Sequence, residues 1–276
     1  MVKGIQLEGL RILGKPEAFA RHYYEQGADE LLYMDIVASL YGRNSLLDII
    51  SKTSKEIFIP LTVGGGLRTI EDISDVLNAG ADKVALNTAV INEPELIRKA
   101  SRRFGSSTIV VSIEAKKIND SYEAYTDNGR EKTGRDAIKW ATEAVELGAG
   151  EIMITSIDRE GTGKGFDLLL TKTISESVSV PVIACGGAGE TEHVYEVFNK
   201  TKSNAASIAS LVHYDFNNNL LEKNKSDPDQ YVNPLMMQRG FSQIKATNLI
   251  SIKKYLFDRK IFSRNFLNIE NSPISI

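Results

Sequence analysis

Two acidic residues of this 276-residue chain follow apolar segments in positions that suit proton transfer. Asp35 follows the segment Leu-Leu-Tyr-Met, and Glu114 follows the apolar run Ile-Val-Val-Ser-Ile. A carboxyl group at the end of a buried strand can act as a general acid or base, because burial can raise its pKa towards neutrality. The same residue can also serve as a polar cap of the strand. The pattern therefore predicts an acid/base role for Glu114 and leaves the structural role open.

Two glycine clusters are candidates for phosphate binding. Gly64-Gly65-Gly66 follows the run FIPLTV, and Gly186-Gly187-Ala188-Gly189 follows the run PVIAC. Glycines let the backbone approach an anion closely, and the N–H groups at the start of the following helix favour negative charge. One glycine triplet alone could equally be a tight turn, so the argument depends on there being two.

The two clusters belong to an internal repeat with a constant offset of 121 residues. Residues 27–36 align with 148–157, residues 60–72 with 181–193, and residues 81–89 with 202–210, all without a gap. Short periods indicate solenoids, whereas a period this long indicates two equivalent halves of one closed fold. If each half supplies one anion site, the ligand should carry two phosphates.

The repeat also extends each candidate phosphate site to a second loop. In α/β barrels, phosphate is often bound by the loops after strands 7 and 8. In this chain those loops contain Gly186-Gly187 and Ala209-Ser210, and their repeat equivalents are Gly65-Gly66 and Asn87-Thr88. The polar segment 158–162 after another strand belongs to the same end of the fold and could clamp a substrate or form a solvated turn.

A second charged set lies at the opposite end of the predicted strands. Glu30, Lys83 and Glu151 each open a strand. Charges at strand starts usually belong to solvated turns. Because the three occupy equivalent positions, and Glu30 and Glu151 are related by the repeat, they could also form a charged ring at the floor of a barrel.

Alternating strands and amphipathic helices predict an α/β fold, a (β/α)8 TIM barrel with an internal two-fold half-barrel repeat. The expected strands are 30–34, 58–63, 83–87, 108–113, 151–155, 180–184 and 205–208, and the expected helices are 16–26, 44–55, 70–79, 93–104, 134–147, 167–177 and 190–199. Seven of eight strands are visible. We expect the missing first strand to precede Met1, because an open sheet would leave unpaired edges.

The carboxyl-terminal part departs from this pattern. We expect the barrel domain to span 1–213, followed by a polar insertion or loop at 214–247, a final barrel helix at 248–263 and a tail at 264–276. The insertion contains Asn217–Asn219, several charges and two prolines, which favour an extended loop.

Composition narrows the class of protein. The chain is 42% hydrophobic and 25% charged with a net charge of −3, so no basic field favours nucleic acid. No run approaches the length of a membrane span, and the single cysteine, Cys185, suits a reducing cytoplasm. The three histidines, His22, His193 and His213, lack metal-ligand spacing and are expected at the surface or at helix starts, without a metal or cofactor.

Six segments together resemble the cyclase subunit family of imidazole glycerol phosphate synthase, from the histidine pathway. They are GADELLYMDIVAS, IPLTVGGGLR, GADKVALNTA, VVSIEAK, GAGEIMITSIDREGTGKGFD and PVIACGGAGETEH, and the resemblance covers roughly residues 2–213. It implies a duplicated barrel that binds a ribonucleotide with two phosphates. It further implies a partner glutaminase, whose ammonia enters at the barrel floor and crosses the core. At the other face the substrate is aminated, cleaved and cyclised to imidazole glycerol phosphate and an aminoimidazole carboxamide ribonucleotide.

The resemblance assigns roles to individual positions. The first phosphate site would hold Gly66, Asn87 and Thr88, with Gly65 beside them. The second would hold Gly161, Gly187, Ala209 and Ser210, with Gly186 beside them and Glu160 where the family usually has Asp. Lys3 would lie on a mobile loop that closes over substrate. Glu30, Lys83 and Glu151 would form the ammonia gate.

Two departures from the family pattern leave alternatives open. The family uses two aspartates as acid and base, and the first falls in sequence that this chain lacks, together with an arginine of the gate. The second is Glu114 here, whose extra methylene moves the carboxylate, and a displacement of about 1 Å can cost roughly a hundredfold in rate. The alternatives are an ammonia-channelling relative that amidates a sugar for surface polysaccharide, the related ribotide isomerase, and an inactive phosphate-binding chain.

Overall fold

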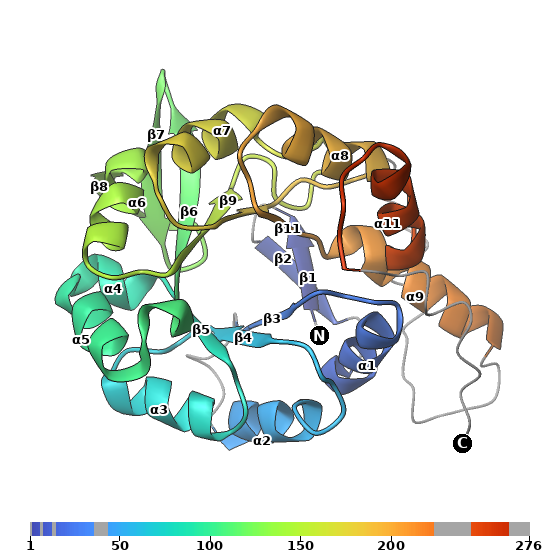
Figure 1. Ribbon diagram of the computed structural model, residues 1–276, viewed down its shortest axis with the longest axis horizontal. Helices are drawn as coiled ribbons and strands as arrows, with labels where there is room; N and C mark the ends of the chain where they lie inside the picture. The colour runs from blue at the N-terminus through green and yellow to red at the C-terminus, as the bar shows by residue number, and fades with distance from the viewer. Residues whose placement is uncertain (1, 6–7, 13–14, 36–43, 224–243, 265–276) are drawn as a thin grey trace.

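A computed structural model describes residues 2–5, 8–12, 15–35, 44–223 and 244–264 (Figure 1). The described part contains seven parallel strands that form one curved sheet. Their order across the sheet follows the chain: β3 (Leu31–Met34), β4 (Leu61–Gly64), β5 (Lys83–Leu86), β6 (Ile109–Ile118), β9 (Glu151–Ser156), β10 (Val182–Cys185) and β11 (Ala205–Ser207). The predicted parallel α/β sheet is thereby confirmed.

Helices surround the sheet as an outer ring (Figure 1). They are α1 (Pro16–Glu25), α2 (Asn44–Thr53), α3 (Ile70–Asn78), α4 (Thr88–Asn92), α5 (Glu95–Phe104), α6 (Ala137–Glu146), α7 (Leu168–Ser177), α8 (Thr191–Lys200), α9 (Ser210–Lys223) and α11 (Leu249–Asp258). This arrangement is that of a (β/α)8-type barrel. Within the described residues, β3 and β11 each pair with a parallel strand on one side only.

The two halves repeat in three dimensions with the offset seen in the sequence. Helices α1 and α6 begin at residues 16 and 137 and end at 25 and 146, which is 121 residues apart at both ends. Strands β4 and β10 show the same offset, from 61–64 to 182–185. The candidate loops after these strands are therefore equivalent in the fold as well as in the sequence.

A β-hairpin that the sequence did not predict extends from the end of β6. Strand β7 (Ser121–Thr126) pairs antiparallel with the outer part of β6, and β8 (Glu131–Asp136) pairs with β7. Because β6 continues to Ile118, Glu114 lies within the strand rather than directly after it. The expected end of this strand at 113 and the expected helix start at 134 are both wrong.

A second hairpin opens the described chain. Strands β1 (Val2–Ile5) and β2 (Glu8–Ile12) pair antiparallel in a sheet of their own, with Lys3 opposite Arg11. Subtracting the repeat offset from residues 123–133 gives residues 2–12, so this hairpin is the repeat equivalent of β7–β8. Lys3, which the resemblance assigned to a mobile loop, lies in β1 of this hairpin, and its side chain lies outside the described part.

Two apolar clusters fill the structure. The larger lies between the sheet and the helices and includes the fully buried side chains of Trp140, Ile154 and Leu170. The smaller consists of Ala85, Val110 and Met153, on three neighbouring strands, with partly buried neighbours that include Cys185. Because side chains alternate across a strand, these residues face the inside of the barrel.

The carboxyl-terminal prediction needs one correction. Helix α9 runs through residue 223, so residues 214–223 are helical and not an extended loop. Helix α11 falls within the expected final helix at 248–263. Residues 224–243 and 265–276, which hold most of the rest of the predicted insertion and nearly all of the tail, lie outside the described residues.

No helix in the described part of the chain is both long enough and apolar enough to cross a membrane.

Candidate functional site

Glu114 lies near the carboxyl end of the parallel strands, where barrel active sites are found. Its side chain is only 9% exposed, and its Oε2 atom accepts a hydrogen bond of 2.8 Å from the backbone N–H of Gly129. Burial raises the pKa of Glu114 to about 7, with the N–H of Gly129 and the amide of Asn87 opposing the rise and the charges of Asp127 and Glu160 adding to it. A carboxyl with this pKa can both give and take a proton near neutral pH.

Polar residues of three neighbouring strands lie at the level of Glu114. Glu114 is opposite Thr155 in the β6–β9 register, Thr155 is opposite Cys185, and Cys185 is opposite Ser207. Burial raises the pKa of the Cys185 thiol to about 12, and the charges of Glu160 and Glu114 contribute to the rise. The thiol is therefore uncharged near neutral pH. Sequence reasoning missed a role for these three residues, although Thr155 and Ser207 lie in predicted strands and Cys185 directly follows one.

The first candidate phosphate site combines the loop after β4 with the start of α4. Gly65 and Gly66 both have positive φ angles, 98° and 68°. A side chain at Gly65 would lie 2.1 Å from the carbonyl oxygen of Asp35, so this position requires glycine for backbone packing alone. Asn87 and Thr88 precede and begin α4, and Thr88 Oγ1 accepts a hydrogen bond of 3.2 Å from the N–H of Asp127.

The second candidate site combines three loops at the equivalent place. Gly161, Gly186 and Gly187 all have positive φ, and a side chain at Gly187 would lie 2.2 Å from the carbonyl oxygen of Gly165. The N–H of Gly165 also donates to the Gly187 carbonyl at 2.8 Å, so the loops after β9 and β10 pack backbone to backbone. Glu160 is half-buried beside Gly186, since a side chain at Gly186 would lie 2.9 Å from Glu160 Oε2.

Ala209 and Ser210 complete the second site. They follow β11, and Ser210 is the first residue of α9. The first N–H groups of a helix have no acceptor within the helix and carry the positive end of its dipole. The amide groups at this helix start are therefore available to an anion.

Two buried polar atoms at this end of the barrel have no hydrogen-bond partner among the described residues. They are Asn87 Oδ1, in the first half, and Ser156 Oγ, at the end of β9 in the second half. Buried polar atoms are nearly always hydrogen-bonded, so an unpaired one indicates a water or a ligand. Asn87 Oδ1 lies at the Glu114 end of the barrel, whereas Ser156 is opposite Ala115 in the β6–β9 register, on the strand face that packs against the helices.

At the opposite face, the structure brings the three predicted gate residues together. Lys83 Nζ lies 2.8 Å from Glu30 Oε2 and 2.7 Å from Glu151 Oε1, and Thr62, which is buried, donates its hydroxyl to Glu30. Desolvation lowers the pKa of Lys83, but the hydrogen bonds from its ammonium to Glu151 and Glu30 outweigh this, so the net pKa is raised. The cluster is a charged ring at the start of the inner apolar core.

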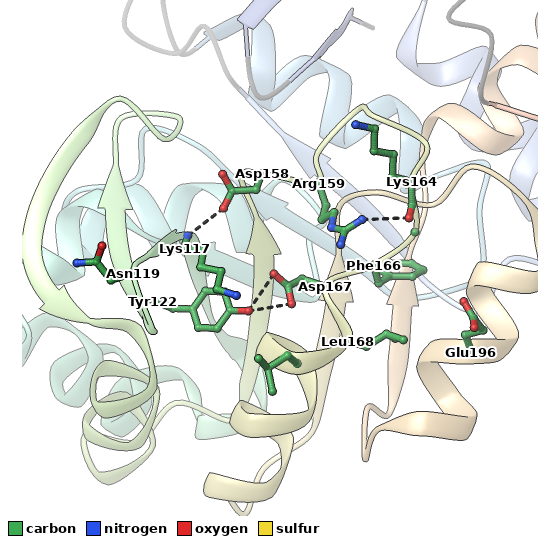
Figure 2. Close-up of a pocket in the computed structure, with 12 residues that line it drawn as sticks. Lys117, Asn119, Tyr122, Asp158, Arg159, Lys164, Phe166, Asp167, Leu168 and Glu196 are labelled. Atoms are coloured by element: carbon green, nitrogen blue, oxygen red, sulfur yellow. Dashed lines mark hydrogen bonds between the residues drawn. The ribbon is translucent and has the colours of Figure 1, made fainter.

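A hollow of about 710 Å³ lies outside the barrel, between the β6–β7 hairpin and the loop after β9 (Figure 2). Figure 2 shows the Tyr122 hydroxyl directed at the Asp167 carboxylate, at 3.0 and 3.1 Å from its two oxygens. The N–H of Lys117 donates to Asp158 Oδ2 at 2.9 Å. The predicted clamp segment 158–162 therefore lines this hollow in part, and it contacts the hairpin.

Two of the three histidines, His22 and His213, pack against Tyr23 in one aromatic cluster. His213 lies in the first turn of α9, one of the two positions expected for the histidines, and there it is buried and contacts the Tyr23 hydroxyl through Nδ1. His193 Nδ1 accepts the N–H of Gly189 at the start of α8. The described residues contain no group of three or more His, Cys, Asp or Glu that could hold a metal ion.

Comparison with known proteins assigns the family. A family model described as histidine biosynthesis protein matches residues 1–217. A relative from Legionella pneumophila named imidazole glycerol phosphate synthase subunit HisF is 56% identical over 193 residues, which cover 70% of this chain and 91% of the relative.

Two further relatives carry the same name. The protein from Bacillus cereus (strain G9842) is 49% identical over 215 residues, covering 78% of this chain and 85% of the relative. The protein from Methanocaldococcus jannaschii is 48% identical over 234 residues, covering 78% of this chain and 86% of the relative. The chain therefore belongs to the histidine biosynthesis protein family, among the HisF subunits of imidazole glycerol phosphate synthase.

Proposed function

We propose that the chain is the cyclase subunit of imidazole glycerol phosphate synthase and acts in histidine biosynthesis. It uses ammonia to convert a bis-phosphorylated ribonucleotide into imidazole glycerol phosphate and an aminoimidazole carboxamide ribonucleotide. The observation that carries the proposal is the position of Glu114. It is a buried carboxyl with a pKa of about 7, at the barrel end that holds two equivalent glycine loops.

The two loops bind the two phosphates in this proposal. Gly66, Asn87 and Thr88 hold one phosphate, and Gly161, Gly187, Ala209 and Ser210 hold the other, with Gly65, Gly186 and Glu160 shaping the loops. The support is the equivalent position of the two loops, which follow strands 121 residues apart, and the unpaired Asn87 Oδ1 at the first loop pair. Binding at both ends fixes the ribonucleotide across Glu114, which then gives or takes the proton of the cyclisation. Lys3, on the β1–β2 hairpin, would help to close over the substrate.

A glutaminase supplies the ammonia at the floor of the barrel. The gate of Glu30, Lys83 and Glu151 opens onto the inner cluster of Ala85, Val110 and Met153, whose side chains offer ammonia an apolar path towards Glu114. An apolar interior favours neutral ammonia over the ammonium ion, because a charge in such a core is costly. The relatives are named as subunits, which supports a complex. We place the complex in the cytoplasm, since the pathway is biosynthetic and the single cysteine suits reducing conditions.

Exposed aromatic pairs support docking at this face. Phe58, three residues before β4, is 78% exposed and its ring lies 6.1 Å from that of Tyr24. Phe262, after α11, is 77% exposed and its ring lies 5.9 Å from that of Phe257. Aromatic side chains of this kind are enriched in protein interfaces.

The experiment is a turnover assay with the ribonucleotide and two nitrogen sources. We expect product with free ammonia, product with glutamine only when a glutaminase of the same pathway is added, and loss of both in Glu114→Gln. If the chain binds the ribonucleotide but does not turn it over with ammonia, the proposed cyclase activity is wrong and only a binding function is left.

A further inference from the structure

The β7–β8 hairpin contacts residues from both repeated halves of the barrel. At its stem, Tyr122 is buried and its hydroxyl bonds to Asp167, while the N–H of Lys117 bonds to Asp158 (Figure 2). Both carboxylates belong to the loop after β9, in the second half. The stem is therefore fixed to that loop by three hydrogen bonds that do not involve the tip.

At its tip, the hairpin contacts the first half. The turn Asp127-Asn128-Gly129 has positive φ at all three residues, 51°, 58° and 74°. The N–H of Asp127 donates to Thr88 Oγ1 at 3.2 Å, and the N–H of Gly129 donates to Glu114 Oε2 at 2.8 Å. One turn thus holds the buried carboxyl and the start of α4 at the same time.

A third contact strengthens this link. The side-chain amide of Asn87 donates to the carbonyl of Tyr125 at 3.4 Å, and Tyr125 is opposite Glu114 in the β6–β7 register. Tyr125 is itself buried. Glu114 therefore lies beneath the hairpin, with little access to water from that side.

We propose that the Asp127–Gly129 turn is a positioning element that shields the Glu114 carboxyl from water, fixes its orientation and ties it to Thr88. The proposal rests on the proposed function for the role of Thr88 in phosphate binding, but not for the position of Glu114. Because Thr88 Oγ1 accepts from Asp127, its own hydroxyl proton is left to donate to a phosphate oxygen. A phosphate at Thr88 would then meet an acid/base group already held in place.

The titratable groups around Glu114 come from three elements. The charged carboxylates of Asp127 and Glu160 lie on the turn and on the loop after β9, and the uncharged thiol of Cys185 lies on β10. Of the influences on the Glu114 pKa, burial is the largest, and the hydrogen bond from Gly129 acts in the opposite direction. Displacing the turn exposes the Glu114 carboxyl to water and also removes the hydrogen bond from Gly129. Because burial is the larger influence, the pKa of Glu114 should fall towards the ordinary carboxyl range.

The test compares Asp127→Val with Asp127→Asn. Both variants lose the same charge, but asparagine tolerates a φ of 51° whereas a β-branched valine does not. The pKa of Glu114 is measured by carbon-13 NMR of protein labelled at the glutamate carboxyl carbon, with the Glu114 signal assigned by its loss in Glu114→Gln. Inorganic phosphate serves as the probe for binding at Thr88 and is titrated by calorimetry.

We expect the proton-dissociation constant of Glu114 to be about tenfold larger in Asp127→Val than in Asp127→Asn, and phosphate binding to be weaker. Equal pKa values in the two variants would overturn the proposal. Tyr122→Phe loosens the stem without changing the turn, so it should lower the pKa of Glu114 by a smaller amount. This variant replaces Asp127→Val if Asp127→Val does not fold. If native protein fails to turn over the ribonucleotide, the proposed function fails, while the pKa comparison in unliganded protein still decides the role of the turn.

Discussion

The ammonium group of Lys83 lies 2.7 Å from the carboxylate of Glu151, so an ion pair joins the first repeated half to the second at the barrel floor. The side chains of both partners are less than one fifth exposed, Lys83 at 18% and Glu151 at 17%. An ion pair at this depth is costly to break on one side, because the remaining charge stays poorly solvated. Lys83 also holds Glu30, so one lysine separates two carboxylates.

Charge reversal at Lys83 tests the gate. Lys83→Glu places three carboxylates together, and we expect glutamine-dependent turnover to fall by about tenfold or more, corresponding to about 1.4 kcal/mol in the barrier. Turnover with free ammonia should fall less, because free ammonia does not depend on the docked glutaminase. Steady-state kinetics with each nitrogen source give the comparison.

Lys99→Glu is the matched control for this variant. Lys99 pairs with Glu93 at 2.6 Å, but both side chains are 58% exposed on the outer surface. Exposed pairs contribute little, so this reversal should leave both activities near the native value. Equal losses with both nitrogen sources in Lys83→Glu would argue for damage to the fold instead of the gate.

The raised pKa of Glu114 predicts a pH-dependent stability. The folded chain retains the Glu114 proton up to about pH 7, whereas the unfolded chain releases it near the ordinary glutamate pKa of 4.5. The folded state therefore binds more protons between these values, and its stability falls as pH rises through this window. The loss amounts to about 3 kcal/mol at most and is constant above the folded pKa.

Urea denaturation of native protein and Glu114→Gln at several pH values measures this loss. The variant cannot ionise, so its stability relative to the native chain should increase from pH 4.5 to pH 7. Glu176→Gln, at an exposed position on α7, is the control and should follow the native curve. A constant difference between native protein and Glu114→Gln would show that the carboxyl titrates normally.

The parallel sheet was predictable because its strands carry a continuous signal. Each is a short apolar run, and the run at residues 61–64 recurs at 182–185 with a glycine pair after it in both halves. Buried parallel strands need apolar residues on both faces, so composition alone marks them. The positions of the two glycine loops followed from the same repeat.

The hairpin was missed because its signal is weaker. Residues 121–126 alternate imperfectly between exposed and buried side chains, and residues 131–136 are polar and largely exposed. The Asp-Asn-Gly turn at 127–129 was the available indication, since such sequences favour positive φ and hairpin formation. The Gly129 bond to Glu114 could not be predicted without this hairpin.

In helix α9, a segment predicted to be a loop is helical. Polarity and three consecutive asparagines suggested a loop from residue 214, yet the helix continues to 223. Its first turns are anchored by tertiary contacts, including Leu211, which is fully buried, and Phe216, whose ring lies 4.7 Å from that of Phe19. Packing of this kind overrides weak helix propensity.

Substitution of the helix-start hydroxyls tests the two phosphate sites separately. Thr88→Val and Ser210→Ala each remove one possible donor to phosphate without touching the glycines. We expect each to weaken binding of the bis-phosphorylated ribonucleotide by about 1–2 kcal/mol, roughly tenfold, measured by calorimetry. Gly187 is a poorer target, because its substitution collides with the Gly165 backbone whether or not phosphate binds.

Thr173→Val is the control for this pair of variants. Thr173 lies on α7, and its hydroxyl donates to the Leu169 carbonyl of its own helix. Its substitution should leave the affinity unchanged. If Thr88→Val weakens binding while Ser210→Ala does not, only the first site binds phosphate, and the two-site proposal is wrong.

The exposed aromatic pairs at the barrel floor predict where the glutaminase docks. The buried ammonium of Lys253 on α11 lies 2.7 Å from Asp29, next to the gate residue Glu30, and so fixes this helix beside the floor. Phe58→Ser and Phe262→Ser should each weaken the complex by more than about 1 kcal/mol, a common cost of removing an aromatic side chain from an interface.

Leu169→Ser is the matched control, since Leu169 is 59% exposed at the start of α7, near the opposite end of the barrel. Affinity is measured by calorimetry with the purified glutaminase, and turnover with free ammonia reports that the barrel is intact. A complex weakened equally by Leu169→Ser would place the interface elsewhere.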